Sequence, residues 1–206
     1  MKINIGKTEL IHFVGIGGIG MSGLALIMDS LGFKIQGSDK SDNKNLNLLR
    51  KRKIPIYLNH NKQNIKNCTV LVVSSAIKKS NPEYRHAKKL NLPIYKRGEL
   101  LGHIVSLMKN IVVTGSHGKT TTTSILSNIM NYAKLDPTII NGGVLNSIGS
   151  SAKLGKSDWS LVESDESDGS FLQIPFNYSI ITNIDNEHLD YYLSLIHISE
   201  PTRQHW

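Results

Sequence analysis

Short apolar runs alternate with longer, more polar stretches over the first 108 residues. The runs have the length of β-strands, and glycine, proline or asparagine separate them from stretches with helical spacing. We expect strands at 10–14, 34–39, 54–58, 69–74 and 93–96, and helices at about 20–31, 44–53, 81–90 and 98–108. Strands that alternate with helices predict a parallel sheet with right-handed crossovers, which is a Rossmann-like α/β domain.

The same alternation starts again near residue 109. We expect a strand from 110 to 114, a helix that fades near 133, a glycine-rich turn at Gly142 and Gly143, and strands at 137–140, 159–163 and 178–184. The pattern therefore predicts two α/β domains, over 1–108 and 109–192. The last stretch, 193–206, looks like translated foreign sequence, so we leave it out of the fold prediction.

The composition is that of an ordinary globular protein, with 39% apolar and 19% charged residues. No apolar run approaches the roughly 18 residues of a membrane span, and the N-terminus does not have the pattern of a signal peptide. The single cysteine, Cys68, excludes an internal disulfide and a thiolate metal cluster, which agrees with a reducing compartment. We therefore expect a soluble cytoplasmic protein without a membrane span.

The net charge of +8 is unevenly divided along the chain. Residues 1–109 hold 19 Lys and Arg against 6 Asp and Glu (+13), whereas residues 110–206 hold 5 against 10 (−5). The basic residues of the first half are scattered and are not interleaved with aromatic side chains, so a nucleic-acid surface is a weak interpretation. A solvated face that attracts small anionic molecules explains them better, and we expect no nucleic-acid partner.

The segment GSHGKTTT at 115–122 follows an apolar strand and opens a helix, as in loops that hold nucleotide phosphates. The backbone N–H groups of 115–119 and the helix dipole would face the phosphates, and the Lys119 ammonium would reach the terminal ones. A hydroxyl of Thr120 or Thr121 would hold Mg²⁺. The common spacing is GxxxxGK[ST], but Val113 stands where its first glycine would be. The loop is therefore the shorter GxxGK[ST] form.

The first predicted strand also ends in a glycine-rich turn. Gly15, Gly17 and Gly20 fit GxGxxG, and Asp39 lies 24 residues after Gly15, close to where a ribose-binding acid is expected. The turn indicates a diphosphate at a helix N-terminus. By itself it does not distinguish NAD, FAD or another nucleotide diphosphate, and the glycines could also serve only tight packing.

Polar clusters follow the last two predicted strands, at 163–168 and 183–190. In an open α/β sheet ligands bind at the carboxyl ends of strands, so the ends after Thr114, Val162 and Thr182 should converge on one site. Four carboxylates within 163–168 need a cation beside them, and Mg²⁺ fits a phosphate loop. Glu163 is best placed to bind it. His188 is an unusual magnesium ligand, so chemistry alone favours a histidine at the surface or behind the ligands.

Taken together, these motifs resemble the Mur ligase family of peptidoglycan synthesis. The matching segments run in family order and are 15–23 GIGGIGMSG, 74–77 SSAI, 97–101 RGELL, 115–122 GSHGKTTT, 163–171 ESDESDGSF and 182–190 TNIDNEHLD. The short phosphate loop is the form that this family uses, although Ser116 stands where threonine is usual. The match stops at Tyr192, so the resemblance implies an incomplete ATP-binding domain after the first one.

The resemblance implies UDP-N-acetylmuramate, ATP and L-alanine as substrates and Mg²⁺ as cofactor, with the muramate carboxylate activated as an acyl phosphate before the amine displaces it. The residues implied for UDP-substrate binding are Gly15, Gly17, Gly18, Gly20, Asp39 and Ser74. Those implied for ATP are Gly115, Ser116, His117, Gly118, Lys119, Thr120 and Thr121. Thr120, Glu163 and His188 are implied to hold metal, and Lys119, Glu163 and His188 to act in catalysis.

Three other interpretations stay open at this stage. A nicotinamide-dependent oxidoreductase would use the first glycine turn but would leave the short phosphate loop and Glu163 unexplained. A non-catalytic nucleotide-binding module is compatible with an incomplete second domain. Within the family, the ligase that recycles murein tripeptide is the near rival, although the segment 166–171 looks more like the alanine-adding branch.

Overall fold

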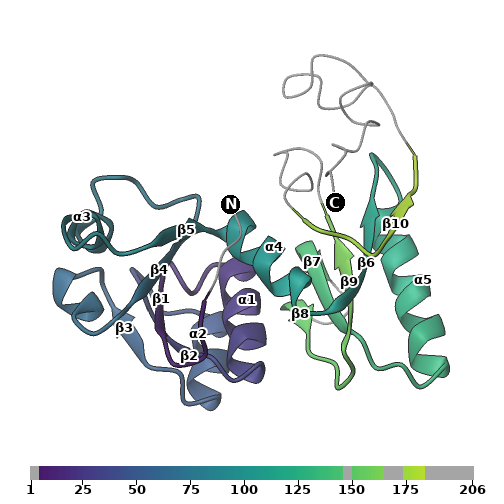
Figure 1. Ribbon diagram of the computed structural model, residues 1–206, viewed down its shortest axis with the longest axis horizontal. Coiled ribbons are helices and arrows are strands. Elements are labelled where there is room, and N and C mark those ends of the chain that lie inside the picture. The colour runs from purple at the N-terminus through teal and green to yellow at the C-terminus, as the bar shows by residue number, and fades with distance from the viewer. Residues whose placement is uncertain (1–4, 146–149, 165–173, 184–206) are drawn as a thin grey trace. The chain divides into compact units, whose positions relative to one another are not determined.

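The computed structural model describes residues 5–145, 150–164 and 174–183, and the chain forms two compact units (Figure 1). The units are Met1–Leu101 and Gly102–Trp206. The division falls within the helix α4 (Arg97–Ser106), ahead of the expected boundary between 108 and 109. Each unit contains a five-stranded sheet, so the predicted α/β class is confirmed.

The first unit is a parallel sheet with the strand order β3-β2-β1-β4-β5. Its strands are β1 (Leu10–Val14), β2 (Lys34–Asp39), β3 (Ile56–Leu58), β4 (Val70–Val73) and β5 (Ile94–Lys96). Its helices are α1 (Ile19–Ser30), α2 (Lys44–Lys51), α3 (Pro82–Lys89) and the first half of α4, with a 3₁₀ turn η1 (Lys62–Ile65) that the sequence did not predict. The order reverses between β1 and β4, where ligands bind in open α/β sheets.

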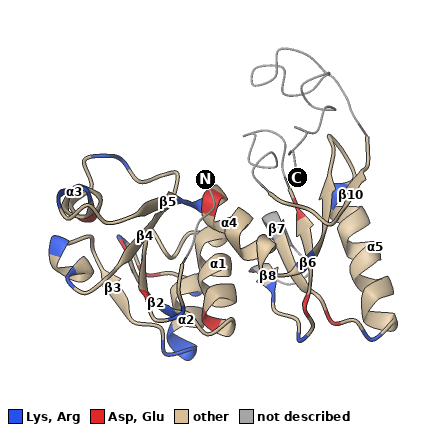
Figure 2. Cartoon of the chain, in the orientation of Figure 1, with Lys and Arg blue, Asp and Glu red and all other residues tan. Residues whose placement is uncertain are grey.

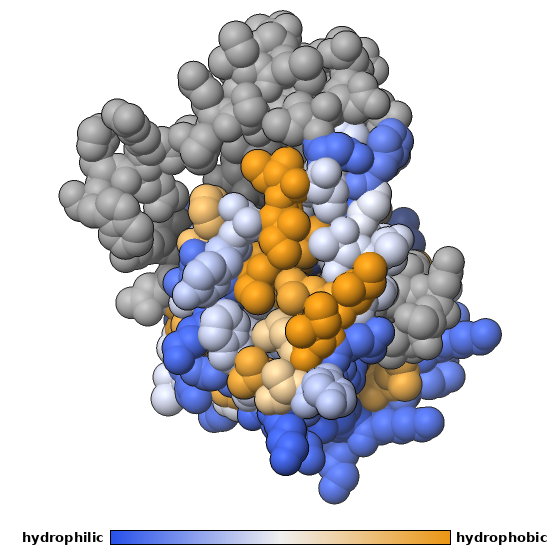
Figure 3. All heavy atoms as spheres, turned by 90° about the vertical axis from the view of Figure 1, so that its right-hand side faces the viewer, coloured by the Kyte–Doolittle hydropathy of each residue, from blue (hydrophilic) through white to orange (hydrophobic). Residues whose placement is uncertain are grey.

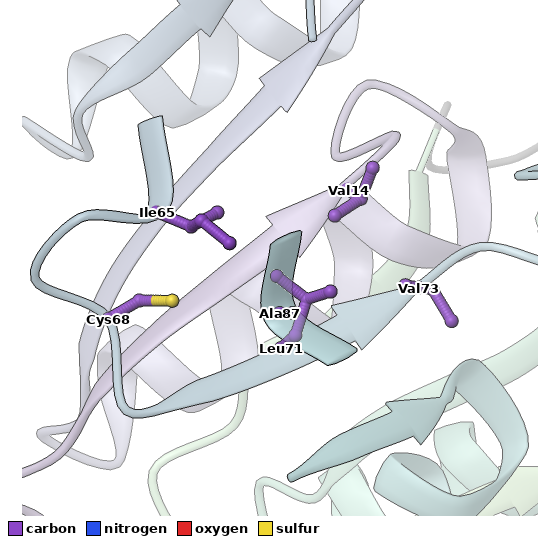
Figure 4. Close-up of a cluster of buried hydrophobic side chains, with 6 residues drawn as sticks. All are labelled: Val14, Ile65, Cys68, Leu71, Val73 and Ala87. Atoms are coloured by element: carbon purple, nitrogen blue, oxygen red, sulfur yellow. The ribbon is translucent and has the colours of Figure 1, made fainter. Parts of the chain in front are cut away.

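The central strands β1, β2 and β4 of this first sheet are mostly buried on both faces, as is typical of a parallel sheet. Right-handed crossovers place α1 and α2 on one face and η1 and α3 on the other. On the η1 and α3 side, side chains from four elements and the loop before β4 form an apolar cluster (Figure 4). Its members are Val14, Ile65, Cys68, Leu71, Val73 and Ala87. This cluster fixes α3 against the sheet.

The second unit has the strand order β10-β6-β9-β7-β8, and only the β7–β8 pair is antiparallel. Its elements are β6 (Lys109–Thr114), α5 (Lys119–Tyr132), β7 (Thr138–Leu145), β8 (Ser150–Lys153), β9 (Trp159–Glu163) and β10 (Tyr178–Ile181). Thr114 pairs with Ile181 and Val113 with Glu163. The ends of β6, β9 and β10 therefore lie at one edge of the sheet, as the sequence predicted.

The expected turn at Gly142 and Gly143 is wrong, because β7 runs through both glycines to Leu145. The pairing of β7 with β8 shifts register between Ile140 and Leu145. Glycine inside a strand often marks such a bulge, since it accepts backbone angles that other residues resist. On both sides of this irregularity β7 pairs antiparallel with β8.

The outer side of α5 and the edge strand β10 expose apolar side chains. Ile125, Ile129 and Tyr132 follow one stripe of α5 and are 56%, 58% and 94% exposed, and Tyr178 and Ile181 of β10 are exposed as well. Figure 3 shows hydrophobic side chains gathered on this side of the second unit. A contiguous apolar surface of this kind is typical of a face that another segment or molecule covers.

Charged side chains are distributed as the sequence suggested. Figure 2 shows Lys and Arg of the first unit spread over several helices, strands and loops rather than gathered along one helix. Within the described ranges, no helix is both long and apolar enough to cross a membrane.

Candidate nucleotide-binding sites

The predicted phosphate loop of the second unit contains two glycines with left-handed backbone angles. Gly115 has φ of +128° and Gly118 has φ of +79°, a region that other residues rarely adopt. Gly118 is the N-cap of α5, so the helix begins at Lys119 as predicted. The Lys119 Nζ atom donates to the carbonyl oxygens of Gly115 (2.6 Å) and Ser116 (3.4 Å). The lysine thus folds back over the loop and keeps its charge beside it.

Glu163, at the end of β9, meets the first turn of α5. The Thr120 hydroxyl donates to Glu163 Oε1 at 2.8 Å, and the residue Glu163 is only 8% exposed. The other carboxylate oxygen, Oε2, is buried and has no hydrogen-bond partner within the described part of the chain. A buried carboxylate oxygen without a partner is unfavourable unless a cation or water satisfies it. A hydroxyl and an unsatisfied carboxylate beside a phosphate loop therefore fit Mg²⁺, which prefers oxygen ligands.

Asn183 belongs to the matched segment 182–190, but the sequence assigned it no role. Asn183, just after β10, accepts hydrogen bonds from the N–H groups of Ser116 (to its backbone oxygen, 3.3 Å) and His117 (to Oδ1, 2.8 Å). The Thr182 hydroxyl donates to the His117 carbonyl at 2.6 Å. In the structure these two amides bind Asn183, whereas the sequence predicted that they face the phosphates. The signal for this contact was the position of Asn183 at the third converging strand end.

His188 and the acidic residues of 165–168 lie outside the described residues. Their predicted parts in metal binding and catalysis stay predictions. Within the residues described, the structure brings together the loop 115–118, Lys119, Thr120 and Glu163.

In the first unit, the last two residues of β2 hold the glycine turn in place. The Ser38 carbonyl accepts from the N–H groups of Gly15 (2.8 Å) and Ile16 (3.0 Å), and Asp39 Oδ2 accepts from that of Gly17 (2.8 Å). Gly15 has φ of +80°. Asp39 therefore lies at the turn as predicted, and the structure gives it a hydrogen bond to the turn that the sequence did not suggest.

The other residues predicted for the UDP substrate also lie around this turn. Ser74, at the end of β4, lies so close to Gly15 that a Cβ on the glycine would be 3.2 Å from the Ser74 Cβ. Gly18 is the N-cap of α1, and Gly20 lies against the Arg97 side chain. The turn thus occupies the switch point between β1 and β4, with the N-terminus of α1 directed at it.

On the α3 side of the sheet, a polar network surrounds the fully buried carboxylate of Glu83, a residue at the start of α3. Glu83 Oε2 accepts from the Ser38 hydroxyl (2.6 Å) and lies 3.3 Å from His60 Nδ1 and 3.5 Å from His12 Nε2. Burial alone raises the pKa of this carboxyl, but the interactions with His12 and the hydrogen bonds from Ser38 and Asn64 outweigh it. The pKa of Glu83 consequently lies below its usual value.

This lowered pKa predicts an acid-dependent loss of stability. Ionised Glu83 stabilises the fold above the ordinary carboxyl pKa of 4.5, and this contribution is lost as the pH falls through the lower folded value. The free energies of unfolding of the wild type and Glu83→Gln should differ most above pH 4.5 and converge below it. Urea titrations from pH 7 to 3 measure this, and a difference that is constant with pH would contradict it.

Two family descriptions match the chain. The description "Mur ligase family, catalytic domain" matches residues 10–109, and "Mur ligase middle domain" matches residues 113–203. The second match reaches into 193–206, which the sequence indicated as foreign. That range lies outside the described residues, so its origin stays a prediction.

Individual relatives agree with these matches. The chain is 65% identical over 200 residues to the UDP-N-acetylmuramate–L-alanine ligase of Pelagibacter ubique, a match that covers 97% of this chain and 43% of the relative. A solved UDP-N-acetylmuramate–alanine ligase of Thermotoga maritima is 33% identical with a TM-score of 0.77, covering 90% of this chain and 44% of that one.

A UDP-N-acetylmuramate:L-alanyl-gamma-D-glutamyl-meso-diaminopimelate ligase of Neisseria meningitides has the same TM-score of 0.77 at 27% identity, covering 92% and 65%. The backbone alone thus resembles both kinds of ligase equally. The chain spans less than half the length of the curated relatives that it matches.

Proposed function

Because the chain belongs to the Mur ligase family, we propose that it is part of an ATP- and Mg²⁺-dependent ligase that joins L-alanine to the carboxylate of UDP-N-acetylmuramate. The observation that carries this proposal is the Thr120–Glu163 contact beside the phosphate loop, with the second Glu163 oxygen buried and unsatisfied. A dehydrogenase that used only the first glycine turn would have no need for this arrangement.

In the proposed reaction, each unit binds one of the first two substrates to react. The turn of the first unit, around Gly15 and Gly17, binds the diphosphate of UDP-N-acetylmuramate, and the loop of the second unit binds ATP. An oxygen of the muramate carboxylate attacks the γ-phosphorus and ADP leaves, which gives an acyl phosphate. The amine of alanine then attacks the acyl carbon, phosphate leaves, and the nitrogen loses a proton as the amide forms. No nucleophile from the protein is required.

The chain's own residues contribute position and charge. Lys119, held at the loop by the Gly115 carbonyl, offsets the negative charge that accumulates as two anions approach. Thr120 and Glu163 would hold Mg²⁺, and His188 would help to hold a second ion. Bound there, Mg²⁺ would neutralise charge on the β- and γ-phosphates. Holding the reacting groups in line supplies a further several kcal/mol of the rate enhancement.

Alanine is favoured over the tripeptide substrate by sequence rather than by backbone shape. The 65% identical relative carries the alanine-ligase name, and the solved alanine ligase is more similar in sequence than the tripeptide-type ligase at equal TM-score. ATP and nucleotide sugars are cytoplasmic metabolites, and a buried free thiol at Cys68 suits a reducing compartment. We therefore place the reaction in the cytoplasm, where it serves peptidoglycan precursor synthesis.

Replacing Glu163 with glutamine tests the metal part of this proposal. Glutamine keeps an oxygen that can accept from Thr120 but removes the negative charge that attracts the cation. In titrations with a fluorescent ATP analogue, Glu163→Gln should weaken binding about tenfold with Mg²⁺ present and have little effect in EDTA.

Asp158→Asn is the matched control, because Asp158 is an exposed carboxylate of the same unit that pairs with Lys109. It should bind the analogue like the wild type under both conditions. Wild-type binding by Glu163→Gln with Mg²⁺, or an equal loss in EDTA, would mean that Glu163 does not hold the cation.

A further inference from the structure

Glu83 is buried at a position where an apolar side chain would cost less free energy to desolvate. Its neighbours on the same face of the sheet include the apolar cluster around Val14 and Ala87 (Figure 4). A buried carboxylate loses its hydration and is retained only where several donors replace the water. Packing of α3 against the sheet therefore does not explain why this position holds a charge.

The donors to Glu83 come from three separate parts of the first unit. Ser38 donates from the end of β2 to Oε2. The Asn61 N–H (3.2 Å) and Asn64 Nδ2 (2.7 Å) donate to Oε1 from the loop and turn that follow β3. The carboxylate thus ties α3, β2 and this loop together at the carboxyl edge of the sheet.

The bond from Ser38 links this network to the glycine turn. The hydroxyl of Ser38 donates to Glu83, while the carbonyl of the same residue accepts from the N–H groups of Gly15 and Ile16. The next residue, Asp39, accepts from Gly17. The N–H groups of residues 15–17 are therefore held by Ser38 and Asp39 of β2, and the Ser38 side chain is in turn held by Glu83.

We propose that Glu83 is a positioning residue for the UDP-substrate site, acting through Ser38 to hold the turn 15–17 in its binding geometry. The inference rests on the proposed function, because it assumes that this turn binds the UDP substrate. Glu83 itself touches no substrate, and α3 and the loop at 61–64 supply the rigid support against which Ser38 is held.

The test compares substrate affinity in the wild-type chain of 206 residues with that of Ser38→Ala, Glu83→Gln and the double variant. Calorimetry with UDP-N-acetylmuramate should show about a tenfold loss in each single variant, as expected for a lost hydrogen bond to a charged group. The affinity of the double variant should be no lower than that of the weaker-binding single variant, because both substitutions break the same hydrogen bond. Ser38→Ala leaves the other contacts of Glu83 in place, so it carries the test even where Glu83→Gln folds poorly.

Leu49→Ala is the matched control for lost stability. Leu49 is fully buried in α2, on the opposite face of the sheet from α3, and has no part in the Ser38 link. This variant should melt earlier yet bind the UDP substrate like the wild type. Amide NMR signals give a second readout: those of Gly15 and Ile16 should shift and exchange faster in Ser38→Ala and Glu83→Gln, but not in Leu49→Ala.

The outcomes separate the two proposals. Absence of UDP-substrate binding by the wild type would overturn the proposed function. Binding by the wild type together with unchanged affinity in folded Ser38→Ala would overturn only the role of Glu83. An equal loss in Leu49→Ala would also overturn it, because the effect would then follow from stability alone.

Discussion

Replacing Gly17 with valine should lower the affinity of the chain for UDP-N-acetylmuramate about 100-fold. A Cβ at this position would lie 2.6 Å from Asn43 Nδ2 and 2.9 Å from Asp39 Oδ2, so both side chains must move. Asp39 then releases the Gly17 N–H, and Asn43 is displaced from the N-cap of α2, where it accepts from two amides. Loss of a charged hydrogen bond (about 1.5–3 kcal/mol) and of a cap (about 1 kcal/mol) accounts for the expected size.

Isothermal calorimetry measures this effect, and Gly6→Val is its matched control. A Cβ at Gly6 would meet its nearest neighbours at 3.7 Å or more, which is ordinary van der Waals contact. This variant introduces the same side chain into the same unit and should keep wild-type affinity. Equal affinity of Gly17→Val and the wild type would remove the turn from the substrate site.

Replacing Gly115 with alanine should abolish most ATP binding, with a loss of at least about 100-fold. The new Cβ would overlap the Thr182 hydroxyl and lie 2.7 Å from the Asn183 carbonyl oxygen, which belongs to backbone that cannot move alone. The Thr182 N–H donates to the Thr114 carbonyl, so displacement of residues 182–183 would also weaken the pairing of β10 with β6. The loop should therefore open and the melting temperature should fall.

Gly32→Ala separates this crowding from the strain of a left-handed backbone. Gly32 has φ of +87° and has nothing within 4 Å of its would-be Cβ. It therefore reports the conformational term alone, about 1–2 kcal/mol, in a region away from both loops. Titration with a fluorescent ATP analogue should show near wild-type binding for Gly32→Ala. Retained ATP binding in Gly115→Ala would contradict the assignment of this loop.

Periodicity predicted most of the fold because most elements are local in origin. Apolar runs such as 10–14 and 70–73, bounded by glycine or polar residues, were identified as strands within one or two residues. The convergence of β6, β9 and β10 also followed, since parallel strands in an open sheet end at one edge. Failures came where neighbours override local preference. Gly142 and Gly143 predict a turn, but β7 pairs with β9 as far as Asn141 and with β8 again at Leu145, so the strand continues through both glycines.

The candidate sites were predicted only as far as their motifs are contiguous. The short loop at 115–122 and Glu163 could be identified because phosphate and magnesium chemistry restrict the residue types. The hydrogen bonds of Asn183 with the loop and of Ser38 with Glu83 could not be predicted, because the pattern places strand ends together but does not show which side chains meet there. Asn81 and Pro82 mark the start of α3 in the sequence, yet nothing local reveals what the Glu83 carboxylate contacts.

The central claim is that the first unit binds a UDP-sugar acid rather than a nicotinamide cofactor. Calorimetric titration of the 206-residue chain with UDP-N-acetylmuramate, and with NADH in parallel, tests it most directly. We predict saturable one-to-one binding of UDP-N-acetylmuramate and no heat with NADH. No heat with UDP-N-acetylmuramate at millimolar concentration, or saturable binding of NADH, would contradict the claim.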